Sequence, residues 1–157
     1  MDSKIERLLR TSQVSFQEIK HQSFNVPIRS PHDFAVALGY DIERITKSVF
    51  LRSKTRDKYV MAVCSCNQKL DLQELAVLAG VNKLEVADKE ELSNLVGYPI
   101  FGVSSIGLSE NIPVFFDASL LEFNTILAGS GESAVEIELA PADLAKISAA
   151  VIAKISI

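Results

Sequence analysis

The sequence predicts an α+β domain built on a mixed, curved, barrel-like β-sheet flanked by helices. Segments with helical spacing of apolar residues alternate irregularly with short segments rich in β-branched and aromatic residues. Their order shows no regular strand–helix–strand repeat, which argues against a doubly wound sheet. The chain has 157 residues, of which 48% are hydrophobic and 23% charged. This size and composition fit a single domain over residues 1–157 with a sizeable core.

Several helix boundaries are marked by residues that cap helices. Ser3 and Glu6 form a capping-box pattern before helically spaced apolar residues, which predicts a helix over residues 3–12. Ser30 followed by Pro31 is a second strong start signal, because serine caps helices and proline suits the first helical position. The expected helices and single turns, in order, cover residues 3–12, 31–38, 41–44, 71–79, 88–95, 117–121 and 141–155.

Two of these helices carry apolar stripes that indicate core packing. In the helix that starts at Asp71, the residues expected to face inward are Leu72, Leu75, Ala76 and Leu78. In the final helix, which opens at Pro141, the expected stripe comprises Leu144, Ile147, Val151 and Ile155.

Short segments between the helices predict the strands of the sheet. The segments at 45–52 and 59–66 are joined by a polar connection, as in a β-hairpin. A glycine-containing turn joins the last two predicted strands. The expected strands cover residues 16–19, 45–52, 59–66, 82–87, 113–116, 123–127 and 134–139.

Charge is unevenly distributed along the chain. The net charge is −4, which argues against a broad basic face that coats nucleic acid. Between Arg44 and Lys58, however, six basic residues accompany a single acidic one, a local charge of +5. This segment is compatible either with a solvated hairpin or with an edge that faces phosphate groups.

No apolar run approaches the ~20 residues that span a bilayer. The first six residues also lack the apolar core of a signal peptide. We therefore expect a cytoplasmic protein with no membrane partner.

Two glycine-spaced stretches stand out, Val96–Gly107 and Ala128–Gly131. The first contains three glycines, a proline and two adjacent serines between apolar residues, so it is too apolar for a disordered linker and too broken for a helix. Glycine allows close approach of the backbone to a ligand, so these stretches predict ordered loops whose amides face a pocket. Two tight turns without a site are the alternative.

Side-chain catalysts are scarce. The histidines, His21 and His32, lie far from each other and from the glycine loops in sequence, and neither a Gly-x-Ser-x-Gly nor an HExxH motif occurs. Cys64 and Cys66 are the only cysteines and have no nearby histidine to complete a metal site. The sequence therefore predicts neither a Ser-His-Asp enzyme nor a metal or cofactor.

One lysine falls within an apolar strand. Strand alternation places Lys47 on the same face as Val49 and Leu51. A lysine on a buried face needs a partner or an anionic ligand, unless it extends along the strand edge to water.

Taken together, these segments resemble the YbaK/ProRS-associated domain family, the aminoacyl-tRNA editing deacylases related to the insertion domain of bacterial prolyl-tRNA synthetases. The resemblance runs from about Ser30 to Lys146, and the order and spacing of its parts are more specific than any single part. The matching segments are Phe34–Gly39, Ile45–Leu51 with the family's lysine at Lys47, Leu70–Ala76, Asn94–Pro99, Gly102–Leu108, Phe116–Leu121 and Ala128–Gly131.

The resemblance implies a trans-editing aminoacyl-tRNA deacylase that hydrolyses the ester of a small amino acid, of the alanine, cysteine or serine class, wrongly attached to tRNA. The expected carrier is proline tRNA (tRNA-Pro), and an aminoacyl-tRNA synthetase such as prolyl-tRNA synthetase is an expected partner. A positioned water attacks, assisted by backbone groups and the substrate's ribose 2′-hydroxyl rather than by a side-chain nucleophile. No cofactor is implied.

The resemblance also implies roles for particular residues. The catalytic set comprises Lys47, Gly102, Ser104 and Gly129. The substrate-binding set comprises Phe50, Phe101, Val103, Ser105, Gly107, Asp117, Ser130 and Gly131. The tRNA-contact set comprises Arg44, Arg52, Lys54, Arg56 and Lys58.

Two residues depart from the family pattern. Phe101 stands where the family usually has glycine, and Ser105 where it usually has proline. A phenylalanine that points inward narrows the pocket in favour of small amino acids. The same departures motivate one alternative, a catalytically weak tRNA- or synthetase-binding module of the same fold. The residues without the resemblance favour another, a small-ligand pocket protein of a different class.

Overall fold

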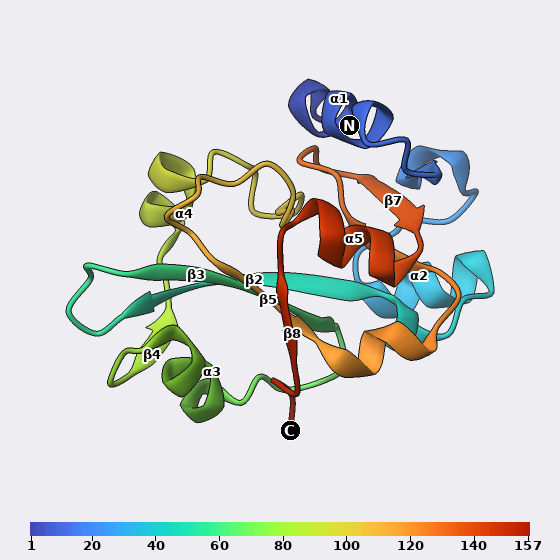
Figure 1. Ribbon diagram of the computed structural model, residues 1–157. Helices are drawn as coiled ribbons and strands as arrows, with labels where there is room; N and C mark the ends of the chain where they lie inside the picture. The colour runs from blue at the N-terminus through green and yellow to red at the C-terminus, as the bar shows by residue number, and fades with distance from the viewer.

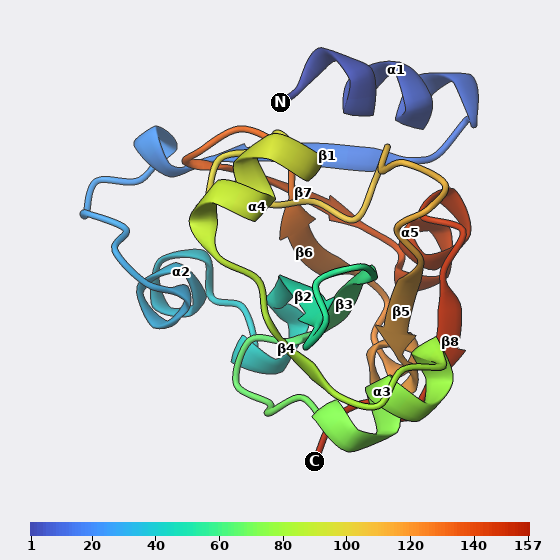
Figure 2. The ribbon, with the colours of Figure 1, turned by 90° about the vertical axis from the view of Figure 1, so that its left-hand side faces the viewer.

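The computed structural model describes residues 1–157 and confirms an α+β architecture (Figures 1 and 2). The helices are α1 (Ser3–Thr11), α2 (Pro31–Leu38), α3 (Leu72–Ala79), α4 (Lys89–Leu95) and α5 (Pro141–Ile147), with 3-10 turns η1 (His21–Ser23), η2 (Ile42–Arg44) and η3 (Ala118–Glu122). The strands are β1 (Phe16–Lys20), β2 (Thr46–Ser53), β3 (Tyr59–Ser65), β4 (Leu84–Val86), β5 (Val114–Asp117), β6 (Ile126–Gly129), β7 (Val135–Leu139) and β8 (Val151–Ala153).

The strands form two sheets rather than one closed barrel. The larger sheet has the order β4-β2-β3-β5-β8 and is mixed, because β5 and β8 run parallel to their neighbours. The smaller sheet has the order β1-β7-β6 and is antiparallel. A single parallel bridge between Ile45 and Leu127 links the sheets, and the Thr46 hydroxyl donates to the Leu127 carbonyl at 2.7 Å. The two sheets therefore curve around a shared core but stay open.

Strand alternation divides the larger sheet into two apolar faces. Phe50, Met61 and Val63 face the main core, which α1 closes with Ile5 and Leu9. The intervening residues of β2 and β3 face a second core beneath α3. In α3 only Leu75 and Ala76 are buried. The expectation that Leu72 and Leu78 point inward was wrong, because an eight-residue helix lying on a sheet buries only a narrow stripe.

The first helix begins one residue earlier than its capping pattern predicts. The cap is Asp2, whose carboxylate accepts from the amides of Lys4 at 2.9 Å and Ile5 at 3.1 Å. Ser3 is already helical, so its expected role as the cap was wrong. An aspartate directly before the helix outcompetes the serine because its charge also complements the helix dipole.

The final helix is shorter than expected. It ends at Ile147, and Ala149 takes a left-handed φ of 51° that turns the chain. Val151 then pairs with Phe115 in the parallel ladder between β5 and β8. The predicted helical stripe through Val151 and Ile155 was therefore wrong, because β-branched residues stabilise a strand here more than they continue a helix.

None of the helices combines the length and the apolar character needed to cross a bilayer.

Candidate functional site

The two glycine loops, far apart in sequence, cross each other in the structure. The Gly131 amide donates to the Gly102 carbonyl at 2.8 Å. A Cβ added to Gly129 would lie 1.9 Å from the Val103 carbonyl oxygen, and one added to Gly102 would lie 2.8 Å from the main chain of Glu132. These glycines allow the main chain of one loop to pack against the main chain of the other. The close approach that they permit is therefore between the two loops rather than between a loop and a ligand.

The serines of these loops are buried and support the same crossing. Ser104 accepts from the Ile106 amide at 3.2 Å, and Ser105 shares a hydrogen bond with Ser148 at 2.8 Å. Ser130 donates to the Val135 carbonyl at 2.7 Å. All three of these loop serines have side chains turned away from solvent. The structure therefore gives these hydroxyls structural partners rather than an open pocket.

The remaining loop residues lie against other parts of the fold. Gly107 adopts a φ of 75° and packs against Lys4 and Tyr98, while Gly131 packs against Asp2 and Ile5. Val103 is partly buried against the main core.

A cavity of about 580 Å³ lies beside the crossed loops, between η1, α2, the start of β2 and the turn before β7. In Figure 2, α2, the connection from β1 to α2 and the loop that leads into β7 lie together on the left. Of the expected site residues, only Phe101 lines this cavity, at a rim where it is 81% exposed. Other residues on its wall include His21, Phe34, Thr46, Ala134 and Glu136.

A histidine–carboxylate pair on the cavity wall was missed by the sequence reasoning. His21 Nε2 lies 2.5 Å from Glu136 Oε2, and the His21 ring meets Phe34 edge to face with centroids 4.8 Å apart. Burial raises the pKa of Glu136, and the charge of His21 opposes this rise. The pair forms because β1 and β7 are neighbours, although the two residues are 115 positions apart.

The turn before β7 carries unpaired main-chain donors. Ala134 has a φ of 64°, in the left-handed region that costs an alanine about 1 kcal/mol. The amides of Ser133 and Ala134 have no hydrogen-bond acceptor within the chain. Both residues line the cavity and are exposed, and main-chain amides without an internal acceptor are available to a bound oxyanion.

Lys47 lies one residue beyond this wall, after Thr46. It is half-buried, pairs with Cys64 across the β2–β3 ladder, and has no carboxylate within ion-pair distance. Burial raises the pKa of the Cys64 thiol to about 11 and also raises that of Cys66, while the Lys47 charge opposes both shifts. Lys47 is therefore a cation without an anion of its own, close to the cavity but not on its lining.

Two other expected substrate contacts are part of the interior. Phe50 lies on the main-core face of β2, where its ring stacks on Tyr59 with centroids 5.3 Å apart. Asp117 is 1% exposed and fastens the C-terminal segment by accepting from the Ile155 amide at 2.9 Å and the Ser156 hydroxyl at 3.1 Å.

Two arginines of the basic segment are already engaged. Arg44 donates to the Thr125 carbonyl at 2.9 Å and to the Tyr40 hydroxyl at 2.8 Å, and its guanidinium lies 3.8 Å from Glu138. Arg52 contacts a cluster of three carboxylates, Glu85, Asp88 and Glu91. Both guanidinium groups therefore have structural partners within the protein.

The rest of the basic segment stays free. Lys54, Arg56 and Lys58 are exposed at the β2–β3 turn and form no ion pair. Because β2 is eight residues long, this turn lies roughly 23 Å from Thr46, at about 3.3 Å per residue. In Figure 1 the hairpin spans the molecule between these two ends.

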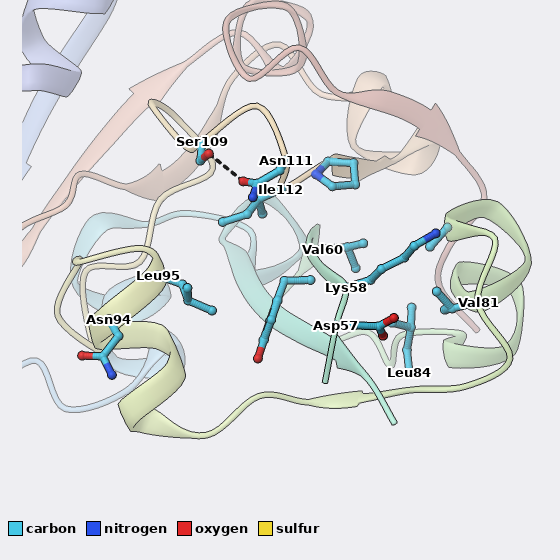
Figure 3. A pocket seen from close by; sticks show the side chains of 13 residues that line it. Asp57, Lys58, Val60, Val81, Leu84, Asn94, Leu95, Ser109, Asn111 and Ile112 are labelled. Carbon is cyan, nitrogen blue, oxygen red and sulfur yellow. Dashed lines mark hydrogen bonds between the residues drawn. The ribbon is translucent and has the colours of Figure 1, made fainter. Parts of the chain in front are cut away.

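A second cavity, of about 560 Å³, opens beside the hairpin turn. Figure 3 shows the polar side chains of Lys58, Asn94 and Asn111 around it, with Val60 and Leu84 among its apolar residues. Asp57 also lines this cavity beside Lys58, and the Asn111 side-chain oxygen accepts from the Ser109 hydroxyl at 2.6 Å, so the lysine is not the only charge there.

Comparison with known proteins assigns the family. The aminoacyl-tRNA editing domain model matches residues 25–147. A protein of Enterococcus faecalis, provisionally named a Cys-tRNA(Pro)/Cys-tRNA(Cys) deacylase, EbsC, is 34% identical over 113 residues, which are 71% of this chain and 68% of that protein. The chain belongs to the aminoacyl-tRNA editing domain family.

Two further similarities concern the domain and its fold. A proline–tRNA ligase of Thermosipho melanesiensis is 29% identical over 102 residues, which are 65% of this chain but only 18% of the ligase. A crystal structure described as that of a candidate trans-editing enzyme for prolyl-tRNA synthetase superposes with a TM-score of 0.79 at 23% identity, covering 100% of this chain and 99% of that one. The latter likeness shows a shared fold.

Proposed function

We propose that this protein is an aminoacyl-tRNA deacylase that removes a small amino acid, of the alanine, cysteine or serine class, from mischarged tRNA-Pro. The observation that carries the proposal is the 580 Å³ cavity lined by Ser133 and Ala134, whose amides have no acceptor within the chain, in a member of the editing family. The name of the Enterococcus faecalis relative supports the substrate class.

The proposed reaction is the hydrolysis of an already activated ester. Water attacks the carbonyl carbon, the bond to the ribose oxygen breaks, and a free amino acid and a ribose hydroxyl result. The amides of Ser133 and Ala134 are suited to stabilise the developing oxyanion, since such donors are most effective when they need no reorganisation. Lys47 anchors the terminal phosphate, which supplies the anion that this half-buried cation lacks.

Selectivity limits explain why such an enzyme is needed. A synthetase pocket cannot strongly reject a smaller amino acid, since each methylene contributes only about 1–3 kcal/mol of discrimination. A second site that admits only small residues restores accuracy. Because Phe101 is exposed at the rim, we assign it to stacking on a nucleotide base of the acceptor end rather than to filling the pocket.

The free end of the hairpin is proposed to contact the tRNA backbone. Lys54, Arg56 and Lys58 are suited to phosphate binding because they are exposed and form no ion pair. Three contacts give weak, salt-sensitive binding, so a synthetase partner is proposed to supply most of the tRNA affinity.

A deacylation assay tests the proposal. Alanine, cysteine and serine esters of tRNA-Pro are compared with the correct proline ester, and Lys47→Ala is compared with Lys69→Ala, an exposed lysine outside the site. We expect preferential hydrolysis of a small ester and, for Lys47→Ala, a loss of roughly tenfold to a hundredfold, as for a charged hydrogen bond. Binding of tRNA without hydrolysis would instead support a binding module. If the protein neither binds nor hydrolyses any tRNA, the result would support a small-ligand pocket protein.

A further inference from the structure

We propose that His21 and Glu136 form the acid–base pair that activates the attacking water. This inference rests on the proposed deacylase function, and it adds a side-chain base to a site that the sequence predicts to work without one. His21 also lies outside residues 25–147, the range matched by the family model.

The geometry leaves one ring nitrogen free for chemistry. Glu136 Oε2 lies 2.5 Å from His21 Nε2, so a carboxylate there holds the proton on Nε2. His21 Nδ1 has no hydrogen-bond partner in the chain, and both residues line the cavity that also contains the free amides of Ser133 and Ala134. A neutral imidazole with its lone pair on Nδ1 is the form that a general base requires.

The pair is held on rigid elements. The His21 amide donates to the Ala134 carbonyl at 2.9 Å, which continues the β1–β7 ladder. Glu136 lies in β7, between Ile19 of β1 and Gly129 of β6. A base fixed in this way keeps its orientation without an entropic cost during the reaction.

The electrostatic surroundings of the pair are simple. The remaining charged residue on the cavity wall is Arg29, from the segment before α2, and β2 contributes only Ile45 and Thr46. On β1, Lys20 lies next to His21 but 3.5 Å from Glu18, and on β7 Glu138 accepts from Tyr40. Burial raises the pKa of Glu136, and the charge and hydrogen bond of His21 oppose this rise.

The proton balance closes within the site. His21 Nδ1 takes a proton from water as the hydroxide attacks the ester carbonyl. When the tetrahedral intermediate collapses and the carbon–oxygen bond to the ribose breaks, the same proton passes to the leaving ribose oxygen. The new carboxylic acid releases its proton to solvent, and His21 returns to its neutral form.

The test measures kcat against pH for His21→Ala, His21→Asn and Glu136→Gln, with His32→Ala as the matched control on the exposed first turn of α2. We expect both His21 variants to lose roughly a hundredfold or more in kcat, the size typical of general-base catalysis. Added imidazole should restore part of the rate of His21→Ala. Glu136→Gln should also lower kcat, because it removes the carboxylate partner of His21 Nε2 that orients the ring.

Separate outcomes decide the two claims. If the wild type hydrolyses a mischarged tRNA and folded His21→Asn keeps its kcat and pH profile, the base assignment is overturned while the deacylase function stands. If the wild type hydrolyses no charged tRNA, the function falls and the base assignment with it. Thermal melts of each variant identify losses that come from unfolding, and imidazole rescue cannot arise from a structural role.

Discussion

The two ends of β2 differ in how their charged groups are held. At the Thr46 end, His21 and Glu136 are paired, half-buried and supported by strands of the smaller sheet. At the hairpin end, Lys54, Arg56 and Lys58 are exposed and unpaired. Paired groups on rigid elements suit bond-breaking chemistry, whereas free cations on a turn suit non-specific attraction of phosphates. In the proposed function, β2 thus separates the catalytic groups from the groups that attract tRNA.

The largest expected effect is at the cavity end. Gly129→Ala should destabilise the fold by about 3 kcal/mol, because its Cβ would lie 1.9 Å from the Val103 carbonyl oxygen in rigid main chain. Gly80→Ala is the control, since its Cβ meets nothing within 4 Å and only its φ of 70° is strained, at about 1 kcal/mol. Urea unfolding measures the free energy of unfolding of both variants. Equal losses of stability would mean that the main chain at the loop crossing shifts to accommodate the added methyl group.

The next effect sharpens the contrast from the hairpin end. The triple variant Lys54→Ala, Arg56→Ala, Lys58→Ala should raise KM about tenfold and leave kcat unchanged. The slope of log affinity against log salt should fall by about 2 to 3, close to one per lost phosphate contact. Arg52→Ala is the comparison, because its carboxylate partners predict a loss of stability rather than of salt dependence. If the dependence of affinity on salt concentration is unchanged in the triple variant, the hairpin turn does not contact the tRNA.

A smaller effect is expected at the cavity rim. Phe101→Ala should raise KM by about 5-fold, or about 1 kcal/mol, because stacking on a single base contributes about 1–3 kcal/mol. Phe101→Tyr keeps a ring and should behave like the wild type, and Ile100→Ala removes an exposed apolar neighbour that cannot stack. A change in the preferred amino acid instead of KM would show that the ring reaches the acyl pocket.

The smallest effect concerns pH and stability at the hairpin end. A hydrogen bond from Tyr59, with further help from the Asp88 amide and Arg52, lowers the pKa of Glu91 to about 2. An unfolded glutamate titrates near about 4.3, so this stabilisation is complete above that pH and is lost as pH falls towards 2. Glu91→Gln should flatten the fall in stability between these values, and exposed Glu90→Gln should not. Parallel pH dependences of the wild type and Glu91→Gln would contradict the assignment.

Local signals predicted much of the fold. The helix start at Ser30 and Pro31 and the basic hairpin between residues 45 and 66 depend on neighbours in sequence, and both are present. The C-terminal strand was missed because its parallel partner, β5, lies more than thirty residues away and supplies the energy that overrides a helical pattern.

The candidate site was harder to predict because its contacts are non-local. The composition of the glycine loops revealed the loops themselves. It did not reveal that they pack on each other and bury Ser104, Ser105 and Ser130. The contact between His21 and Glu136 depends on the pairing of β1 with β7, in which Ile19 lies opposite Glu136 and His21 lies two residues further along, next to Ala134. The carboxylates that engage Arg52 come from β4 and α4, whose positions no local pattern reveals.

The most direct test measures kcat and KM separately for hydrolysis of a mischarged tRNA-Pro by two variants, one at each end of β2. We predict that His21→Asn loses kcat with little change in KM, and that the Lys54, Arg56 and Lys58 triple variant raises KM with kcat intact. The reverse result, with kcat lost at the hairpin and preserved at the cavity, would contradict the account.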